Sequence, residues 1–379
     1  MANKRAEMAL SQSAFSISER NLKKSLLSFI LLGSLVAFFC SKSEWMGRTY
    51  TEDGVPVIEN HGPGIWGENI NKKISFSEDF TLGKESGENH VMFHTDIDVA
   101  VDPDANIYVL DMRNNRFLKF DKDGNHLWTA GKQGQGPGEL LGPSKIKINP
   151  YHQEICVLDS FFKLHIYDLE GYYNRTIRSD RAIEDFQYLS DERIFAQITI
   201  PQQTGLAGAY LNSQFEFLEK FPAEYSYGPK ISGGGYIGGN IEYIQDIIYM
   251  VLPDIYEIRE YDGNGNLLRK IKRDFSFDPP EVKRLERGGF SITGRTKIGP
   301  CFRDKRGFLI NQVSQIKGET EKDIEVQFFL DFIRNDGKFL GSYFLPKWTK
   351  LISVDFYNKY YFVTISPFPK VIRSTLEIK

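Results

Sequence analysis

Cysteine, histidine and net charge are all scarce in this sequence. Its 379 residues contain three cysteines and six histidines, and the acidic and basic side chains nearly cancel at a net charge of −3. No CxxC spacing and no Cys/His cluster is present, so the sequence predicts no zinc site. The near-neutral charge argues against a nucleic-acid-binding protein, which carries a basic excess. We therefore expect no metal, no cofactor and no nucleic-acid partner.

Short catalytic motifs are also lacking. The glycine-rich stretch 134–138 has no following Lys-Ser/Thr, which excludes a phosphate-binding loop. No Gly-x-Ser-x-Gly elbow occurs, and no cysteine has a His partner in its sequence context. Cys156 lies in an apolar, strand-like run, where a buried and unreactive thiol is expected. We name no catalytic residue, and the lack of these motifs favours a non-enzymatic protein over an enzyme.

A long apolar run that could cross a membrane is missing from the N-terminal region. The apolar stretch 26–39 follows Arg20, Lys23 and Lys24 and is shorter than the about 20 residues that a span needs. Basic residues before a short apolar stretch are typical of a secretory signal. Residues 35–40 resemble a bacterial lipobox, which implies acylation of Cys40. Phe39 stands where that pattern has a small residue, so an uncleaved signal anchor is the alternative.

Aromatic and turn-forming residues are abundant. The chain has 29 Phe and 19 Tyr, which favour strands, and 33 Gly and 16 Pro, which suit many tight turns. Residues 96–127 read as one unit of four short strands, with turns at 102–104 and at Asp123-Gly124. Four antiparallel strands per repeat are typical of a propeller blade.

A resemblance to an NHL repeat rests on Asn106-Ile107-Tyr108-Val109, Asp111, Asn114-Asn115-Arg116 and Lys119-Phe120-Asp121. The linker 134–139 is similar to that of bacterial six-bladed β-propeller proteins of lipoprotein type. Weaker copies follow at a spacing of about 47 residues, as in 154–159 and 166–171. The resemblance implies an all-β, six-bladed propeller of four-stranded antiparallel blades.

Three further features complete the predicted architecture. The alternating segment 74–82 is expected to close the ring by pairing with the last blade, which is otherwise short of a strand. Asp278, the two prolines after it and Gly288-Gly289 predict a small helix inserted between blades 4 and 5. We divide the chain into an export segment 1–40, an extended tether 41–69 on the rim and the propeller 70–379.

Basic residues are concentrated around the predicted insertion. Residues 269–306 carry twelve Lys/Arg and five Asp/Glu, a net charge of +7, which leaves −10 on the rest of the chain. Such asymmetry raises the local concentration of anions. The candidate ligand-binding residues are Lys283, Arg284, Arg287, Arg295 and Lys297. The alternative is a solvated loop whose charges pair with neighbouring blades.

Acidic residues and histidines offer a weaker hypothesis of a metal or acid–base site. Asp98, Asp102, Asp104, Asp111 and Asp159 fall at strand ends and turns, where a carboxylate bonds nearby backbone N–H groups. The six histidines do not recur at one repeat position, so we predict no His-bound metal. Lactonase-type propellers hold a metal with Glu, Asn and Asp of different blades, which leave no linear motif, so such a site stays an alternative.

Two functions are therefore compared. The first is an exported, membrane-anchored binding or scaffold module at the cell envelope, with a protein or an anionic or carbohydrate ligand. Its membrane contact would be the lipidated Cys40 or the uncleaved anchor. The alternative is a metal-dependent propeller hydrolase or lyase of lactonase type. The identity of the ligand is beyond what the sequence determines.

Overall fold

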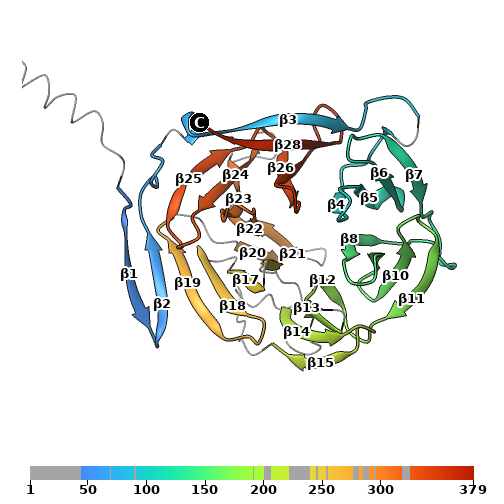
Figure 1. Ribbon diagram of the computed structural model, residues 1–379, viewed down its shortest axis with the longest axis horizontal. Coiled ribbons are helices and arrows are strands. Elements are labelled where there is room, and N and C mark those ends of the chain that lie inside the picture. The colour runs from blue at the N-terminus through green and yellow to red at the C-terminus, as the bar shows by residue number, and fades with distance from the viewer. Residues whose placement is uncertain are drawn as a thin grey trace, which may run out of the picture. The chain divides into compact units, whose positions relative to one another are not determined.

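Four-stranded antiparallel sheets follow one another around a ring (Figure 1). The computed structural model describes residues 44–68, 70–88, 91–190, 192–199, 206–221, 240–244, 246–252, 255–275, 281–284, 290–293, 296–317 and 325–379. Residues 45–379 make up one compact unit. Each sheet is a blade whose first strand lies nearest the ring axis. The predicted all-β, six-bladed propeller is confirmed.

The blades contain the following strands. Blade 1 has β4 (Ile97–Val101), β5 (Ile107–Asp111), β6 (Arg116–Phe120) and β7 (His126–Ala130). Blade 2 has β8 (Pro143–Asn149), β9 (Glu154–Asp159), β10 (Lys163–Asp168) and β11 (Tyr173–Arg178). Blade 3 has β12 (Ile183–Tyr188), β13 (Arg193–Thr199), β14 (Leu206–Asn212) and β15 (Phe217–Lys220). Blade 4 has β16 (Asn240–Ile244), β17 (Ile247–Leu252), β18 (Glu257–Asp262) and β19 (Leu267–Arg273). Blade 5 has β22 (Thr296–Arg303), β23 (Leu309–Lys317), β24 (Glu325–Ile333) and β25 (Phe339–Phe344). Blade 6 has β26 (Thr349–Val354), β27 (Lys359–Thr364), β28 (Lys370–Ile378) and β3 (Ile74–Leu82). Two short 3₁₀ turns, η1 (Ile70–Lys72) and η3 (Met112–Asn114), lie between strands.

One pattern of side-chain to backbone hydrogen bonds recurs in the tight turns of the blades. Asp102 Oδ1 accepts hydrogen bonds from the backbone N–H of Asp104 at 3.0 Å and of Asn106 at 2.8 Å. The same two bonds, to residues two and four positions later, are made by Asp121, Asp168, Asn212, Asp262 and Asp355. A short carboxylate or amide that satisfies two N–H groups stabilises a tight turn. This repeated turn explains why the strands recur at a regular spacing.

The hydrophobic core lies between the blades rather than at the centre of the ring. Six clusters of buried side chains occupy the six junctions between neighbouring blades. Cys156 belongs to the cluster between blades 2 and 3 and is fully buried, and burial raises the pKa of its thiol to about 12. The sequence-based prediction of a buried Cys156 is confirmed.

The ring is closed by chain segments from opposite ends of the sequence. β3 pairs with β28 in an antiparallel register that runs from Ile74 opposite Ile378 to Leu82 opposite Val371. Figure 1 shows β3 and β28 side by side at the rim of the last blade. The predicted closure by the segment 74–82 is confirmed, and it leaves blade 6 with four strands.

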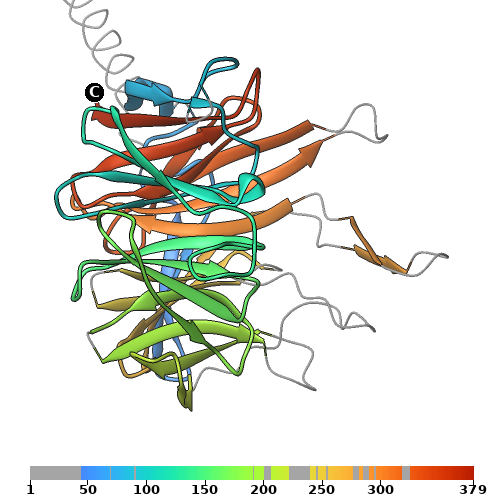
Figure 2. The same ribbon diagram turned by 90° about the vertical axis from the view of Figure 1, so that its right-hand side faces the viewer.

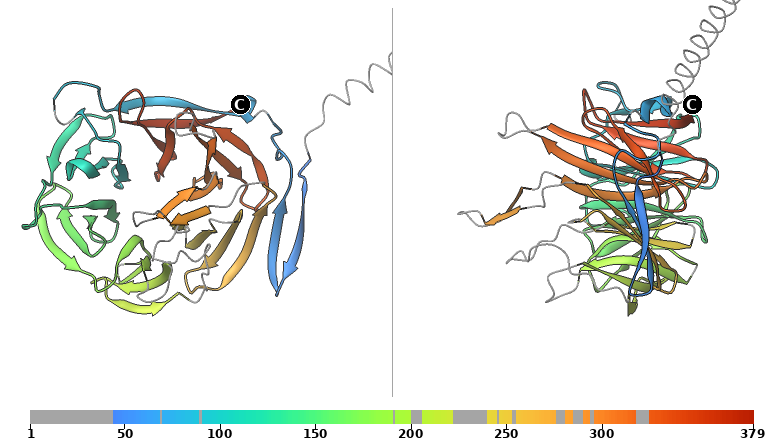
Figure 3. Two further views of the ribbon diagram at one scale, coloured as in Figure 1. Left: turned by 180° about the vertical axis from the view of Figure 1, so that it is seen from behind. Right: turned by 90° about the vertical axis from the view of Figure 1, so that its left-hand side faces the viewer.

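The segment 41–69 differs from the extended tether that we expected. Its described part forms a hairpin of β1 (Gly47–Glu52) and β2 (Val55–Asn60), and β2 adds in parallel to β19 at the rim of blade 4. Blade 4 thus becomes a six-stranded sheet, and the left-hand view of Figure 3 shows the hairpin outside the ring. Asp53-Gly54, both at positive φ, make the two-residue turn that this pair of residues favours.

The predicted helix between blades 4 and 5 is wrong. Residues 281–293 instead contribute a hairpin, which we call the arm, made of β20 (Glu281–Arg284) and β21 (Phe290–Thr293). Figure 2 shows the arm projecting from one face of the ring. A helix of about ten residues is marginal without packing, whereas the alternating Phe-Ser-Ile-Thr sequence of β21 suits a strand.

The described residues include no helix of the length and apolar character that a membrane crossing requires. Cys40 and the rest of the export segment 1–40 lie outside the described residues.

Candidate functional site

The inner strands of the six blades surround a central channel. A cavity of about 510 Å³ lies there, lined by residues of β4, β8, β12, β16, β22 and β26. Seen down the ring axis, these strands face one another around the opening (Figure 1). Three lysines, one arginine and three carboxylates line the cavity: Asp98, Lys145, Lys147, Asp185, Glu242, Arg303 and Lys350.

Two of the lysines share one carboxylate across the junction of blades 2 and 3. Lys145 Nζ lies 3.3 Å from Asp185 Oδ2, and Lys147 Nζ lies 3.3 Å from Asp185 Oδ1. The lysines are two residues apart on β8 and therefore point to the same side of the strand. Burial opposes ionisation of Asp185, but the two ammonium groups outweigh it and hold the pKa of this carboxyl below its usual value. The Asp185 carboxylate in turn raises the pKa of Lys145.

Glu242 has a different environment on the next blade. Its Oε2 accepts a hydrogen bond of 2.9 Å from the side-chain amide of Gln187. Burial disfavours the charged carboxylate and raises the pKa of Glu242 to about 7, with the Asp185 charge adding to the effect and Lys147 opposing it. The cavity thus holds a carboxyl group that changes charge near neutral pH, which is common at functional sites.

Lys350, on the inner strand of blade 6, has no hydrogen-bond or ion-pair partner within the described part of the chain. Burial lowers the pKa of its ammonium group, and the nearby Asp98 charge opposes this shift. Asp98 itself accepts a hydrogen bond of 3.0 Å from the backbone N–H of Ile146 on blade 2. Lys350 is therefore a cation that faces the cavity without direct compensation.

Three of the charged lining residues lie toward one end of the cavity. Asp98, Lys145 and Lys350 lie near the start of their inner strands, whereas Arg303 and the apolar residues Val101, Ile148, Ile244 and Val354 lie at or next to the strand ends. All inner strands begin at the face that carries the connections between blades. The arm belongs to one such connection, so Asp98, Lys145 and Lys350 lie toward the face from which the arm projects (Figure 2).

The structure places only part of the predicted anion-binding set. Lys283 and Arg284 lie on β20 of the arm, and Lys297 lies on β22 of blade 5. Arg287 and Arg295 lie outside the described residues. The described members all belong to the connection between blades 4 and 5 or to the strand that follows it. Their role in binding stays a prediction.

The aspartates considered for metal or acid–base chemistry separate into two groups. Asp102, Asp111 and Asp159 accept backbone hydrogen bonds near strand ends, as the turn hypothesis predicts. Asp98 instead lines the cavity. Across the described ranges, no group of three or more His, Cys, Asp or Glu side chains is placed to hold a metal ion.

The sequence analysis missed the cluster in the channel. Asp98 and Lys145 stand one 47-residue repeat apart, and each comes directly before a buried apolar residue of the inner strand, Val99 or Ile146. This charged position was the available signal. It was hidden because Asp185, Glu242 and Lys350 do not share this spacing, and only the closed ring brings the five strands together.

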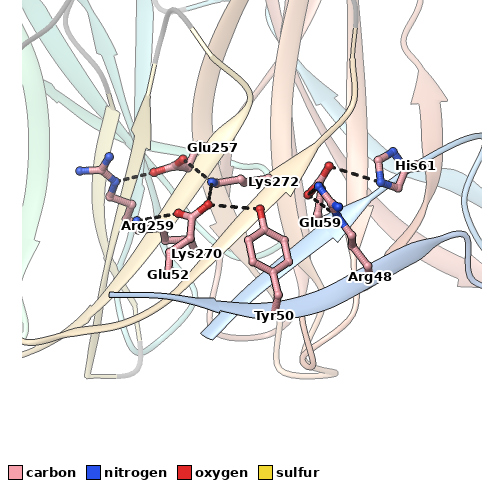
Figure 4. A network of polar contacts seen from close by, with 9 residues as sticks. All are labelled: Arg48, Tyr50, Glu52, Glu59, His61, Glu257, Arg259, Lys270 and Lys272. Carbon is pink, nitrogen blue, oxygen red and sulfur yellow. Dashed lines mark hydrogen bonds and ion pairs between the residues drawn. The ribbon is translucent and has the colours of Figure 1, made fainter. Parts of the chain in front are cut away.

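A second hollow, of about 630 Å³, lies between the β1–β2 hairpin and blade 4. Figure 4 shows the charged network along it. Glu52 on β1 accepts hydrogen bonds from Lys270 at 3.0 Å and from Lys272 at 2.6 Å, and these lysines hold the pKa of Glu52 at about 2. Arg48 pairs with Glu59 at 2.8 Å. The ion pairs stabilise the hairpin on the blade, so we read this network as structural.

Comparisons with known proteins agree with the architecture. A family model described as a 6-bladed beta-propeller matches residues 95–227. The chain is similar to a crystal structure of a duf4221 family member from Bacteroides vulgatus, with 12% identity, a TM-score of 0.60 and coverage of 81% of this chain and 99% of that one. It is also similar to a Bacteroides fragilis protein named as an exported protein, with 13% identity, a TM-score of 0.58 and coverage of 85% and 99%. The chain is a six-bladed β-propeller. No curated protein matches it, and the two structures bear on the fold alone.

Proposed function

We propose that this propeller is an exported binding module whose central channel holds a small anionic ligand, such as an acidic sugar. The observation that supports it is the balance of charges in the cavity. Three ammonium groups line it, and among the residues that the structure describes only Asp185 forms ion pairs with them. A ligand carboxylate or phosphate beside Lys350 would gain a charge-assisted hydrogen bond where the protein offers none.

Entry from the arm face is consistent with the distribution of charge. The stretch 269–306, which includes the arm, carries a net charge of +7 in a chain of net charge −3. A positive surface beside a cavity attracts anions and raises their association rate. In this proposal Lys283, Arg284, Arg287, Arg295 and Lys297 attract the ligand, while Lys350 and Lys145 hold it.

Location at the cell envelope belongs to the same proposal. The basic and apolar N-terminal pattern supports export, and similarity to a Bacteroides fragilis protein named as exported is in keeping with it. Anchoring would run through a lipidated Cys40 or an uncleaved signal anchor, as in the lipoprotein-type, NHL-like propellers that the sequence resembles. A larger glycan or a protein that presents an anionic group would use the same face. The hydrolase or lyase alternative stays a prediction from resemblance.

The test is thermal unfolding of the full chain in detergent with sodium glucuronate, inorganic phosphate or glucose, at constant ionic strength. A ligand at 100 times its dissociation constant stabilises a protein by about 2.7 kcal/mol. We expect glucuronate or phosphate to raise the midpoint and glucose to leave it unchanged.

A pair of variants locates the site. Lys350→Met should abolish the anion-dependent shift, because it removes the uncompensated cation. Lys122→Met is the matched control, since Lys122 is exposed and pairs with Asp123 in a turn of blade 1. An anion effect that survives Lys350→Met, or an equal effect of glucose, would contradict the proposal.

A further inference from the structure

The outermost strand of blade 4 has an unpaired edge. In the six-stranded sheet β1 follows β2 and ends the order, so β2 is its only neighbour among the strands that the structure describes. Figure 1 shows β1 as the outermost strand on that side of the ring. An exposed edge of this kind is a template for pairing with another strand.

The hydrogen-bond pattern shows which backbone groups are free. The N–H of His61 donates to the carbonyl of Met46 at 2.7 Å, and Met46 is opposite His61 in the register of the hairpin. Hydrogen-bonded residues alternate along an antiparallel pair. The backbone groups of Arg48, Tyr50 and Glu52 therefore face β2. The backbone groups of the alternate residues Gly47, Thr49 and Thr51 point away from the sheet.

The edge lacks the features that usually prevent pairing. β1 contains no proline, and its register with β2 is continuous over all six residues without a bulge. The strand lies beyond the rim, so neither face of the ring covers it (Figure 3). Natural edge strands are commonly shortened, bulged, interrupted by proline or charged. β1 has two charged residues, Arg48 and Glu52, of opposite sign, and it shows none of the other features.

The sequence of β1 is complementary to itself in one antiparallel register. With Tyr50 opposite Tyr50 of a second copy, Thr49 lies opposite Thr51 and Arg48 lies opposite Glu52. Aromatic pairs, Thr–Thr pairs and opposite charges are the cross-strand combinations that stabilise antiparallel sheets. A shift of two residues in either direction places Arg48 opposite Tyr50, or Tyr50 opposite Glu52, and removes both opposite-charge pairings. Within one copy Arg48 already pairs with Glu59, and Glu52 already pairs with Lys270 and Lys272. The pairings between copies would therefore add to these contacts and select the register.

We propose that two copies of this chain associate through their β1 strands, antiparallel and centred on Tyr50, to form one continuous sheet from two fourth blades. The Thr49 and Thr51 backbone groups of each copy then bond those of Thr51 and Thr49 of the other. Arg48, Tyr50 and Glu52 lie in one row on the same side of the strand (Figure 4). The arrangement is two-fold symmetric, so it closes as a dimer and does not propagate into a filament.

A cysteine placed on the symmetry axis tests the register. The background is the full chain in detergent with Cys40→Ser, because Cys156 and Cys301 are buried. Tyr50→Cys should form an intermolecular disulfide, since a non-hydrogen-bonded pair brings its Cα atoms to about 4.5 Å, within disulfide range. Thr49→Cys is the control. Its own equivalent in the second copy is displaced by two residues, roughly 8 Å away, so it should cross-link far more slowly.

A second variant tests association without a new cysteine. Thr51→Pro removes an outward N–H and leaves the ladder to β2 intact, so it should shift the chain from dimer to monomer in sedimentation velocity. Thr51→Ala should remain dimeric. Thermal unfolding of both variants shows whether the blade is still folded. A wild-type chain that sediments as a monomer at 100 µM, or equal cross-linking of Tyr50→Cys and Thr49→Cys, would overturn the proposal.

Discussion

Asn60 Oδ1 accepts a hydrogen bond of 2.8 Å from the backbone N–H of Phe339, a residue 279 positions later in the chain. The same oxygen accepts from the indole N–H of Trp45, and the amide nitrogen donates to the carbonyls of Lys272 and Gly337. One buried side chain thus joins the N-terminal hairpin to blades 4 and 5.

Replacement of Asn60 should therefore destabilise the propeller strongly. Asn60→Ala leaves the Phe339 N–H and two carbonyls without partners, at about 1–3 kcal/mol for each buried group that stays unsatisfied. We expect a loss of about 3–5 kcal/mol in urea unfolding. Asn174→Ala, on an exposed position of β11, is the control and should change stability by less than about 0.5 kcal/mol. A loss for Asn60→Ala no greater than that of the control would show that water replaces these bonds.

Loss of the Asp185 carboxylate should destabilise the junction of blades 2 and 3. Asp185→Asn leaves Lys145 and Lys147 close together with no anion between them. A fully buried pair would cost about 3–5 kcal/mol when broken, but these lysines are partly exposed and screened, so we expect about 1–2 kcal/mol. Urea unfolding measures the difference. Asp123→Asn, in an exposed turn pair with Lys122, should have no measurable effect.

Stability should depend on the ionisation of Glu242. Burial raises its pKa from 4.5 to about 7, so the folded state favours the protonated form. The folded chain is therefore favoured at low pH, and this advantage is lost as the pH rises from about 4.5 through 7. Glu242→Gln should match the wild type near pH 4.5 and exceed its unfolding free energy by on the order of 2 kcal/mol at pH 8.

Urea unfolding of both proteins at several pH values checks this prediction. The pKa of Asp185 is lowered, so Asp185 titrates at lower pH than Glu242, and the comparison is made above pH 4.5. Parallel pH profiles for the two proteins would contradict the assignment of this dependence to Glu242.

Lys350→Met should stabilise the protein while it removes anion binding. Burial lowers the pKa of Lys350, which means that its charged form costs folding free energy at any pH below that lowered pKa. Replacing the ammonium group by an apolar side chain of similar length removes this cost. A raised thermal midpoint without ligand, together with a lost response to glucuronate, is the expected result. A lowered midpoint would mean that Lys350 has a structural role.

Aromatic contacts of the closing strand β3 should contribute strongly to the unfolding free energy of the propeller. Phe76 on β3 makes edge-to-face contacts with Tyr343, Tyr360 and Phe362 at 5.0–5.1 Å between ring centroids. Truncation of a buried phenylalanine costs about 3–5 kcal/mol, and Phe76 is partly exposed, so about 2–3 kcal/mol is expected for Phe76→Ala. Phe356→Ala, at a largely exposed position, serves as the control in the same urea titration.

The sequence by itself determined the blade. Its turn-capping aspartates, its alternating strands and its spacing of 47 residues are local patterns, because each turn is satisfied by residues two and four positions away. The closing role of 74–82 also followed from the sequence, since an alternating segment and an incomplete last repeat have only each other to pair with.

The tertiary structure decided what the repeats were joined to and what they enclose. The Asp53-Gly54 turn was present in the sequence, but the addition of β2 to β19 depends on the free edge of blade 4, which exists only once that blade has folded. Asp185, Glu242 and Lys350 converge because ring closure brings inner strands together at the axis. Burial and the charged neighbours that meet there, and not the residues' order in the chain, shift their pKa values.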